Sequence, residues 1–376
     1  MSVSPQSKTI GILKTPHDPR VCLLPKEVKL LTGELNLEIL FETGLGGTLN
    51  IDDKEYVEAG ANSAPKEIIF QKADILLSLN HVLKDEETKE GCTFIGIFNP
   101  LFHDKKLDAY QKNNAAVYSL DLVPRTTLAQ SMDVLSSMAS LAGYRAVIKA
   151  ATLYNGVFPM FTTAAGTITP VKILVLGAGV AGLQAIATAK RLGAMVEAFD
   201  VRTSAAEEVR SLGATFIEVE GFTESTKAGG YAIEQSEQYK QKQRQLIHEH
   251  IKLADIVIST ANIPGKKAPL LIEKHSVEAM RPGSVIIDLA AEQDGNCELS
   301  VNNETIIHQE VTIVGNSNLS AEIPAAASHL LSNNYFAFLK YMQKTENPND
   351  SLLSACQILN DSEWVHPHFK NQLQTV

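Results

Sequence analysis

The sequence predicts an α/β protein made of two doubly wound domains with parallel sheets, joined by long helices across a cleft. Short apolar runs alternate with amphipathic segments along most of the chain, which is typical of strands followed by helices. The length of 376 residues suggests two domains rather than one. Between them lies an amphipathic segment, residues 131–154, whose apolar positions recur every three or four residues and predict a bridging helix.

The first domain is expected to begin with a strand at residues 9–14, TIGILK. A helix over residues 25–35 follows, with Pro25 in its first turn, where a missing N–H does no harm. The alternation continues through further expected strands at 38–44, 73–80, 93–100 and 115–124, and through helical stretches near 53–59 and 104–114.

The second domain begins near Val171 and carries six expected strands. These strands are 172–177, 195–200, 214–220, 254–260, 283–290 and 311–316. A helical run at 323–342 is expected to return to the first domain and make it discontinuous. The predicted domains are therefore residues 1–143 with 317–376, and residues 144–316. The tail from about Glu346 is polar and is expected to be loosely ordered.

Composition excludes several classes of function. A net charge of −10 argues against a nucleic-acid partner, because phosphate binding requires a basic surface. No run of about 18 apolar residues is present, and no signal peptide is recognisable, so no direct membrane insertion is expected. His366 and His368 lack a third ligand nearby, so no metal site is expected. The cysteines match no metal or redox spacing and are expected to be reduced thiols of a cytoplasmic-type compartment: Cys22, Cys92, Cys297 and Cys356.

A glycine-rich turn, GAGVAG, connects the strand at 172–177 to a helix. Gly177 permits the tight turn, Gly179 lets the backbone approach a pyrophosphate, and Gly182 lets the helix pack on the strand. Val180 and Ala181 open the helix, whose N-terminus would face the phosphates. This spacing inside a strand–turn–helix unit predicts a dinucleotide-binding domain of the Rossmann type. No such turn follows the first strand of the chain, so the first domain is not expected to hold a dinucleotide in the usual way.

The acid at the end of the next strand indicates which dinucleotide is bound. Asp200 lies 18 residues after Gly182 and is expected to accept hydrogen bonds from the adenosine ribose hydroxyls. Its charge would repel a 2′-phosphate, which favours NAD over NADP. Val201 and Arg202 follow it and are expected to line the same site, although a nearby arginine can also serve NADP.

Several motifs together resemble the NAD(H)-binding component, domain I, of proton-translocating nicotinamide nucleotide transhydrogenase. They run in family order over about residues 8–342, within the alanine dehydrogenase/transhydrogenase superfamily. The motifs are VPRTTLAQSMDVLSSMASLAGYRA (123–146), the glycine unit ending in AFDVR, AGGYAIEQSEQYKQKQ (228–243), IPGKKAPLLI (263–272) and PGSVIIDLAAEQDGNC (282–297).

The resemblance implies four residues at the nicotinamide end of the nucleotide: Arg125, Gln130, Asp133 and Ser136. Arg125 and Asp133 can form an ion pair, while Gln130 and Ser136 can bond the carboxamide or ribose. Hydride transfer depends on placing two nicotinamide rings almost in contact, so positioning is most of what the protein contributes. The alternative is that these polar residues, with Ser131, only cap the long helix.

The stretch AGGYAIEQ resembles the mobile loop of the family, which closes over the nucleotide. Gly229 and Gly230 would give it hinge freedom, and Tyr231 would come near the adenosine. The alternative is a surface loop without a function. Asn262 and Gly265 follow a strand at the same end of the sheet, where backbone contacts to the ribose are expected.

Partners are implied because this chain has one dinucleotide unit and no membrane segment. The resemblance implies a homodimer that transfers hydride between its own NAD(H) and NADP(H) on a partner subunit. Membrane-spanning partners would couple this transfer to proton translocation. The chain is then expected in the cytoplasm, peripheral on the inner face of the cytoplasmic membrane through these subunits.

Two rival interpretations remain open. Alanine dehydrogenase shares both domains, and Arg20 stands where that enzyme has a carboxylate anchor, but its lysine and histidine are missing from ADILLSLN and TFIGIFNP, and its later aspartate is missing near NIPG. The other rival is a non-catalytic NAD(H)-sensing module. It is kept open because Ser320, Ala321 and Glu322 replace the family's Pro-Ser-Arg, so that an expected arginine has become an acid.

Overall fold

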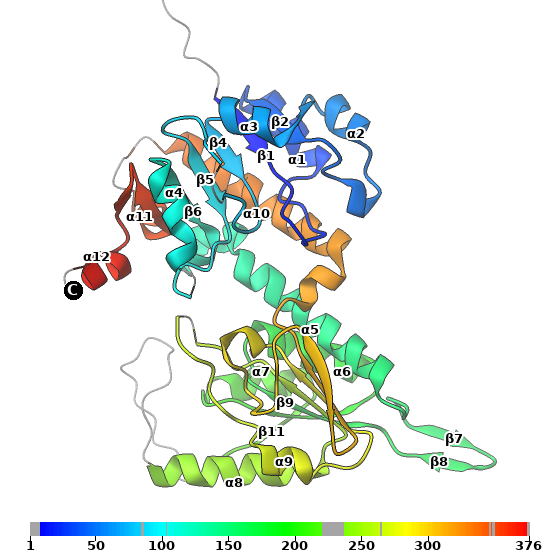
Figure 1. The fold of residues 1–376 in the computed structure, drawn as a ribbon. Helices are drawn as coiled ribbons and strands as arrows, with labels where there is room; N and C mark the ends of the chain where they lie inside the picture. Colours follow the sequence, from blue (N-terminus) through cyan, green and yellow to red (C-terminus); the bar gives the residue numbers. More distant parts are fainter. Residues whose placement is uncertain are drawn as a thin grey trace, which may run out of the picture. The chain divides into compact units, whose positions relative to one another are not determined.

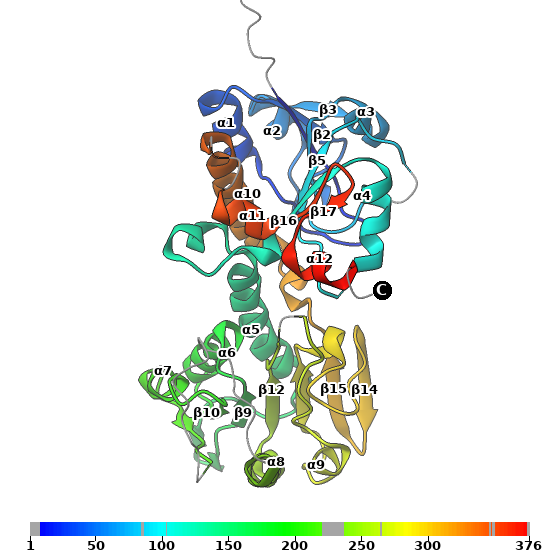
Figure 2. The same ribbon diagram turned by 90° about the vertical axis from the view of Figure 1, so that its left-hand side faces the viewer.

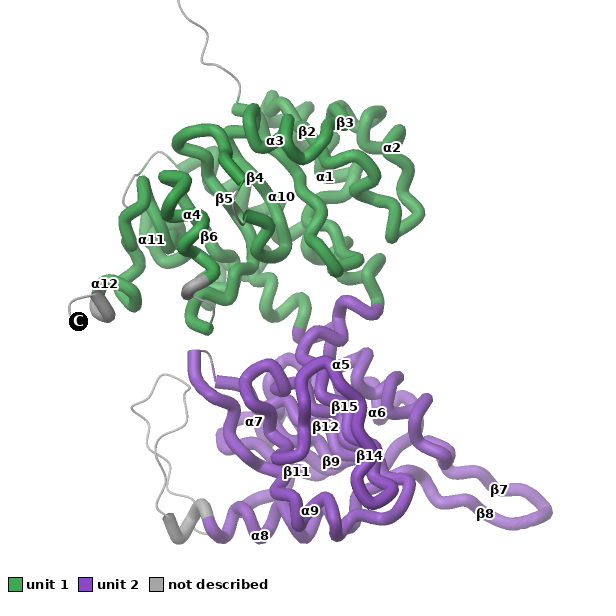
Figure 3. Tube along the Cα trace, in the orientation of Figure 1, with its two compact units in different colours: residues 1–138, 323–376 green, residues 139–322 purple. Residues whose placement is uncertain are grey.

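A computed structural model describes residues 8–83, 86–102, 104–219, 237–263, 265–345, 347 and 350–373. The chain divides into two compact units (Figure 3): unit 1 comprises residues 1–138 and 323–376, and unit 2 comprises residues 139–322. The first unit is thus discontinuous. The boundaries expected from the sequence, after residues 143 and 316, both fall inside unit 2.

Unit 1 is built on one sheet, which has eight strands in its described part, in the order β17-β16-β6-β5-β4-β1-β2-β3. The strands are β1 (Thr9–Ile12), β2 (Glu38–Glu42), β3 (Asn62–Ala64), β4 (Ile75–Leu77), β5 (Thr93–Gly96), β6 (Ala116–Ser119), β16 (Gln357–Asn360) and β17 (Glu363–Trp364). The helices are α1 (Pro25–Glu34), α2 (Asp53–Glu58), α3 (Lys66–Lys72), α4 (Asp108–Lys112), α10 (Pro324–Lys344), α11 (Ser351–Cys356) and α12 (Pro367–Leu373). Strands β1 to β6 are parallel, and β1 is flanked by β2 and β4 (Figure 1).

The expectation of a loosely ordered tail was wrong. Strand β16 pairs antiparallel with β6 and extends the sheet of unit 1. Ile358, Leu359 and Phe369 are buried in one of the two cores of the unit. A short apolar run between polar residues is a weak local signal, and here its burial depends on an edge strand formed more than 200 residues earlier.

Unit 2 repeats this plan with seven strands in its described part, in the order β11-β10-β9-β12-β13-β15-β14. The strands are β9 (Lys172–Leu176), β10 (Met195–Phe199), β11 (Thr215–Phe216), β12 (Ile256–Ser259), β13 (Val285–Asp288), β14 (Glu304–His308) and β15 (Val311–Gly315). The helices are α6 (Val180–Arg191), α7 (Ala205–Ser211), α8 (Glu237–Leu253) and α9 (Lys274–Glu278). Figure 2 shows β10, β9 and β12 side by side, so the strand order reverses direction at β9. The predicted fold class, two doubly wound units with parallel-dominated sheets, is confirmed.

Two hairpins of unit 2 were not predicted from the sequence. Strand β14 pairs antiparallel with β15 through a turn at Gln309 and Glu310, whose φ angles are 46° and 62°. Such turns usually carry Asn-Gly, and without that pair the sequence gives little warning of them. The second missed hairpin joins β7 (Phe161–Thr163) to β8 (Gly166–Ile168), and its strands are exposed.

The central strands of unit 2, β9, β12 and β13, are buried on both faces, which explains their continuous apolar runs. Ile173 and Val175 of β9 pack in one core with residues of α5 and α6, while Leu174 and Leu176 point into the other core, with residues of α8 and α9. This alternation follows from the two-residue period of a strand. The glycine turn therefore follows directly after a strand that is packed on both faces.

The long helix α5 (Val134–Leu153) is preceded by a 3₁₀ segment, η4 (Thr127–Met132), so the helix starts three residues later than the predicted residue 131. The other 3₁₀ segments are η1 (Gly47–Leu49), η2 (Asp104–Leu107), η3 (Leu120–Leu122), η5 (Ala291–Gln293) and η6 (Leu319–Glu322). In unit 2, α5 lies tightly against the first turn of α6. A Cβ atom placed on Gly143 would lie 2.0 Å from the carbonyl oxygen of Ala181. Only glycine lets α5 support the nucleotide-type turn this closely.

Candidate nucleotide site

The glycine turn after β9 has little room where its first and third glycines lie. Gly177 has a φ of +97°, and a Cβ there would lie 2.8 Å from Oγ1 of Thr260. A Cβ on Gly182 would lie 1.9 Å from the carbonyl oxygen of Gly177. A Cβ on Gly179, in contrast, would have nothing within 4 Å. The turn therefore packs closely on its protein side and is open on the side from which a phosphate would approach.

Helix α6 begins immediately after this open position. Gly179 is its N-cap, and no side chain caps the helix, so the first N–H groups are not used by a capping side chain. Uncapped N–H groups at a helix N-terminus attract anions. Val180 is 41% exposed at the first position of the helix, and Ala181 is half-buried. These features fit the pyrophosphate of a dinucleotide.

Asp200 lies directly after β10, and its side chain is 7% exposed. Its Oδ2 accepts the backbone N–H of Ala178 at 2.7 Å, which ties the glycine turn to the end of β10. The guanidinium of Arg202 folds back onto the same carboxylate, with Nε 3.0 Å from Oδ1. Val201 between them is 37% exposed. The structure thus brings the predicted ribose acceptor next to the glycine turn.

Two side chains that were not predicted from the sequence, half-buried Thr260 and buried Asn296, hold this end of the sheet. Thr260 donates through Oγ1 to the carbonyl oxygen of Gly177 at 2.9 Å. Asn296 is fully buried; its Oδ1 accepts the N–H of Ala261 at 3.0 Å, and its Nδ2 donates to the carbonyl oxygens of Ala261 and Pro269, both at 2.8 Å. The only sequence signal was the turn residue before it, Gly295, which has a φ of +74°.

These bonds fix the segment that follows β12, where Asn262 was expected to contact the ribose. The Asn262 side chain is exposed. Asn296 holds both the N–H and the carbonyl of the neighbouring residue Ala261, and this fixes the position of the backbone leading into Asn262. Gly230 and Tyr231, the expected contacts of the mobile loop, lie outside the described residues.

The four residues expected at the nicotinamide end lie in unit 1, on η4 and the start of α5 or just before them. Asp133 accepts the backbone N–H of Ser136 at 2.8 Å and its hydroxyl at 2.6 Å, so Asp133 caps α5. Arg125 and Gln130 have exposed side chains, and within the described part of the chain neither forms a side-chain hydrogen bond or ion pair. The suggested Arg125–Asp133 ion pair is therefore not formed, because the helix cap uses the carboxylate.

The 3₁₀ segment that carries Gln130 is anchored from the other end of the sequence. Asn334 of α10 is 5% exposed and donates through Nδ2 to the carbonyl oxygen of Ser131 at 2.8 Å. Ala129 and Met132 of the same segment are buried in the unit 1 core. The sequence carries no local signal for Asn334, because this contact joins residues about 200 positions apart.

Two family models match this chain almost end to end. They are described as the N-terminal domain of alanine dehydrogenase/PNT, over residues 14–142, and the C-terminal domain, over residues 146–367. The chain belongs to the alanine dehydrogenase/PNT family. Membership implies binding of a nicotinamide nucleotide and an oxidoreductase role, in agreement with the glycine turn of unit 2.

Individual relatives favour the transhydrogenase branch of the alanine dehydrogenase/PNT family. The first part of NAD(P) transhydrogenase subunit alpha of Rhodospirillum rubrum is 40% identical over 375 residues, covering 96% of this chain and 97% of the relative. A solved transhydrogenase from Sinorhizobium meliloti is 40% identical, covers 95% of this chain and 100% of its own, and superposes with a TM-score of 0.86. An L-alanine dehydrogenase structure shares the fold, with a TM-score of 0.80 at 22% identity over 98% of this chain and 99% of its own.

Glu322, the position expected to depart from the family pattern, has basic partners inside unit 2. Its carboxylate accepts from Nε of Arg145 at 2.9 Å and also from Nζ of Lys149, both on α5. Burial alone would raise the pKa of Glu322, but the hydrogen bonds from Lys149 and Arg145 outweigh it and hold that pKa below its usual value. The acid therefore has basic partners and is not an unpaired charge.

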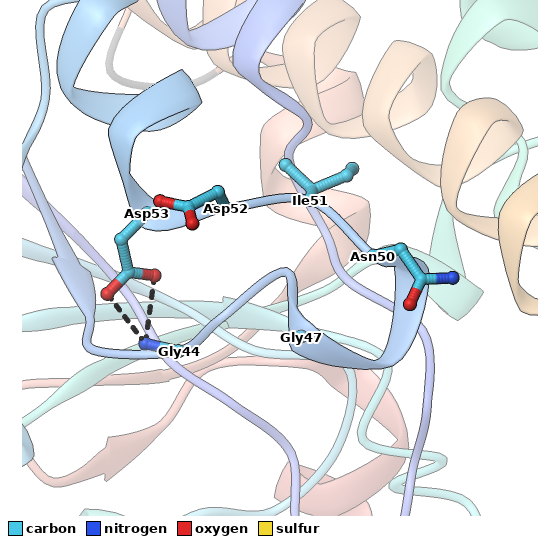
Figure 4. A pocket seen from close by; sticks show the side chains of 6 residues that line it. All are labelled: Gly44, Gly47, Asn50, Ile51, Asp52 and Asp53. Atoms are coloured by element: carbon cyan, nitrogen blue, oxygen red, sulfur yellow. Dashed lines mark hydrogen bonds between the residues drawn. The ribbon is translucent and has the colours of Figure 1, made fainter.

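Unit 1 has two hollows at the end of the sheet where β1 and β2 finish, of about 510 and 500 Å³. Figure 4 shows the first, where the Asp53 carboxylate bonds the backbone N–H of Gly44 at 2.9 and 3.0 Å. In the second, Arg20 donates to Asp18 through Nε at 2.9 Å and Nη2 at 2.6 Å. Arg20, which the sequence placed where alanine dehydrogenase has its carboxylate anchor, is thus engaged by an acid of its own loop.

Three further observations concern the whole described chain. No helix in the described residues combines the length and the hydropathy needed to cross a membrane. Across the same residues, no three or more His, Cys, Asp or Glu side chains are grouped as a metal would require. All four cysteines are buried and free, and burial raises the pKa of each thiol to about 12.

Proposed function

We propose that this chain is the NAD(H)-binding subunit of a proton-translocating nicotinamide nucleotide transhydrogenase. Hydride passes directly between NAD(H) on this chain and NADP(H) on a partner subunit, and membrane-spanning partners couple the transfer to proton translocation. The observation that carries the proposal is the glycine turn, with its open side and uncapped helix next to Asp200, in a chain that matches a transhydrogenase subunit over nearly its full length.

The nicotinamide supplies the hydride chemistry when it is bound, and the residues of this chain bind and orient it. Asp200 accepts the adenosine ribose hydroxyls, which favours NAD(H), while Gly179 and the start of α6 receive the pyrophosphate. The backbone near Asn262 contacts a ribose of the nucleotide. The hydrogen bonds of Thr260 and Asn296 keep these parts in place without contacting the nucleotide.

In this proposal the loop of unit 1 acts on the nicotinamide end. Arg125 and Gln130 contribute exposed side chains, while the Asp133–Ser136 cap holds the start of α5 rigid. The loop at Gly230 and Tyr231 closes over the nucleotide and excludes water. Rigid support counts because hydride transfer falls steeply with small errors in ring placement.

The proposed assembly is a homodimer that works with an NADP-binding subunit and membrane-spanning subunits. The chain then lies in the cytoplasm, on the inner face of the cytoplasmic membrane. The R. rubrum relative is named as one portion of an alpha subunit, which supports the presence of other subunits. The two-unit chain holds the nucleotide and leaves the membrane step to its partners.

The test is reconstitution from purified components. This chain is mixed with the NADP-binding subunit from the same source, and reduction of an NAD analogue by NADPH is followed; NADH with pyruvate and ammonium on the chain alone is the control. Turnover in the mixture only is the expected result. Turnover in the control would assign an alanine dehydrogenase activity instead, and NADH binding and partner docking without turnover would indicate a sensing module.

The site assignment is tested in the same assay with Arg125→Ala and Gln130→Ala. Because both side chains are exposed and make no side-chain hydrogen bond or ion pair in the described chain, the melting temperature should stay nearly unchanged. Turnover should fall at least about tenfold while NADH binding is mostly kept. Full turnover in both variants would remove these residues from the proposed site.

A further inference from the structure

The bonding state of Asp200 carries a further inference, which rests on the nucleotide site proposed above. Its carboxylate accepts four hydrogen bonds, two on each oxygen. Oδ1 accepts the backbone N–H and Nε of Arg202 at 2.8 and 3.0 Å. Oδ2 accepts the N–H of Ala178 at 2.7 Å and Nη2 of Arg202 at 3.1 Å. A carboxylate has about four lone-pair positions, so Asp200 has none left for a ligand.

The four donors are of two kinds. The N–H groups of Ala178 and Arg202 belong to the backbone and are fixed by the turn and by the end of β10. The other two donors, Nε and Nη2, belong to a long side chain that is 41% exposed and, unlike the backbone, can change rotamer. If this side chain leaves, one acceptor position opens on each carboxylate oxygen.

The two vacated positions match what the proposed ligand needs. A ribose with free 2′- and 3′-hydroxyls donates two hydrogen bonds from adjacent atoms, and the guanidinium of Arg202 now presents two donors to the same two oxygens. The guanidinium therefore stands in for the diol. It also donates to the carbonyl oxygen of Ala178 at 3.3 Å, which holds it against the glycine turn.

We propose that the guanidinium of Arg202 is an internal competitor for Asp200, which must be displaced before the adenosine ribose binds, and which sets the coenzyme preference together with Asp200. Its attraction to the carboxylate lowers the affinity for NAD(H). Once displaced, it lies beside the 2′ position, where its charge is the group that a 2′-phosphate would bind. Selectivity thus belongs to the pair and not to the acid alone.

The charge on Arg202 persists in this contact. Hydrogen bonding to Asp200 is the main cause that raises the pKa of Arg202 above its usual value. The competition is therefore between a permanent cation and a neutral diol for one buried carboxylate. Substitution of Arg202 is the direct way to remove it.

The first experiment measures binding of NADH and NADPH to the full-length chain by nucleotide fluorescence, in wild type and Arg202→Ala. The dissociation constant for NADH should fall about three- to tenfold in the variant, or roughly 0.7–1.4 kcal/mol. Binding of NADPH should stay the same or weaken. The matched control is Arg210→Ala on neighbouring α7, which also removes one positive charge, from an exposed pair with Glu218. It should leave both constants nearly unchanged.

The second experiment isolates the diol within one protein sample. Titration calorimetry compares AMP with 2′,3′-dideoxy-AMP, which cannot make the two bonds to Asp200. Arg202→Ala should tighten AMP binding and leave dideoxy-AMP unchanged. The difference between the ligands cancels any general loosening of the variant.

The outcomes separate the inference from the proposed function. The competitor role of Arg202 would be overturned if NADH binding were unchanged or weaker in Arg202→Ala. An equal gain in affinity for AMP and dideoxy-AMP would overturn it as well. Neither result would contradict the nucleotide site itself. A wild-type chain that binds neither NADH nor AMP would overturn the proposed function and the inference with it.

Discussion

The first strands of the two large sheets, β1 and β9, end differently, although they pair with their neighbours in the same way. In unit 1, Ile12 at the end of β1 pairs with Phe41 of β2. In unit 2, Leu176 at the end of β9 pairs with Phe199 at the end of β10. Both first strands also lie at the point where the strand order reverses. The two units can therefore be compared residue by residue at this point.

The comparison shows one bond that both units make. The residue after each phenylalanine is an acid, Glu42 in unit 1 and Asp200 in unit 2. Each carboxylate accepts the backbone N–H found two residues beyond the first strand, from Lys14 at 2.9 Å and from Ala178 at 2.7 Å. The acid-to-backbone bond thus occurs with and without a glycine turn, and it is a property of the fold.

The difference between the units lies in the next few residues. Leu13, which is 2% exposed, occupies the place of Gly177, whose φ is +97°. Helix α6 then begins at Val180, whereas α1 does not begin until Pro25. Unit 1 therefore lacks both the open turn and the nearby helix N-terminus. Shared topology alone therefore does not produce a glycine turn with an open side next to a helix N-terminus; the close packing of turn and helix in unit 2 does.

The largest expected effect comes from adding a side chain where the glycine turn and α6 pack closely. Gly182→Ala places a methyl group 1.9 Å from a backbone oxygen, so the turn must move, and we expect unit 2 to lose about 3 kcal/mol of stability and NADH binding to disappear. The control is Gly33→Ala in α1 of unit 1, where a Cβ has nothing within 4 Å. That change should stabilise by about 0.5 kcal/mol. Urea unfolding and NADH titration measure both, and equal effects would contradict the packing argument.

The next effect concerns the buried side chains that fix the segment after the fourth strand of each sheet. Asn296→Ala leaves two carbonyls and one N–H near β12 without this partner, and we expect a loss of about 2 kcal/mol and weaker NADH binding. In unit 1, buried Tyr335 donates to the carbonyl oxygen of Ser78 after β4 at 2.6 Å. Tyr335→Phe should cost about 1 kcal/mol. If Tyr335→Phe weakens NADH binding as much as Asn296→Ala does, the hypothesis that only unit 2 binds the nucleotide is wrong.

A smaller effect is expected at Glu322, which pairs with two basic side chains of α5 in unit 2. Glu322→Arg places a third positive charge beside Arg145 and Lys149 and should cost about 1 kcal/mol. Adding Lys149→Glu supplies an acid again and should restore most of the stability. Thermal unfolding of the two single variants and the double variant tests this. Additive losses in the double variant would show that Glu322 and Lys149 do not interact.

The smallest effect is the pH dependence of the same contact. Because the pKa of Glu322 is lowered in the folded state, its contribution is present above the ordinary carboxyl value of 4.5 and is lost as pH falls through the lowered pKa. The melting-temperature difference between wild type and Glu322→Gln should be full at about pH 7 and should shrink as the pH drops below about 4. A difference that stays constant over this range would place its origin elsewhere.

Local patterns were enough to predict the strands and helices that have strong periodicity. The strand at 172–177, the turn with its three glycines and the acid at 200 are each recognised from neighbouring residues. The hairpin at Gln309 and Glu310 was missed because its turn uses positive φ without the usual residues. The tail from Glu346 was misjudged because β16 is stabilised by pairing with β6, not by its own propensity.

The sequence by itself determined the two-unit α/β plan, the glycine turn of unit 2 and the position of its acid, because these depend on spacing along the chain. Only the tertiary structure decided how the site is held and what occupies it. Asn296 fixes the segment after β12, and Asn334 anchors η4. The guanidinium of Arg202 occupies acceptor positions on the carboxylate of Asp200. These interactions depend on which side chains the fold brings within hydrogen-bond distance of each acceptor. Periodicity and motif spacing describe residues that are close in the sequence, so they do not predict these contacts.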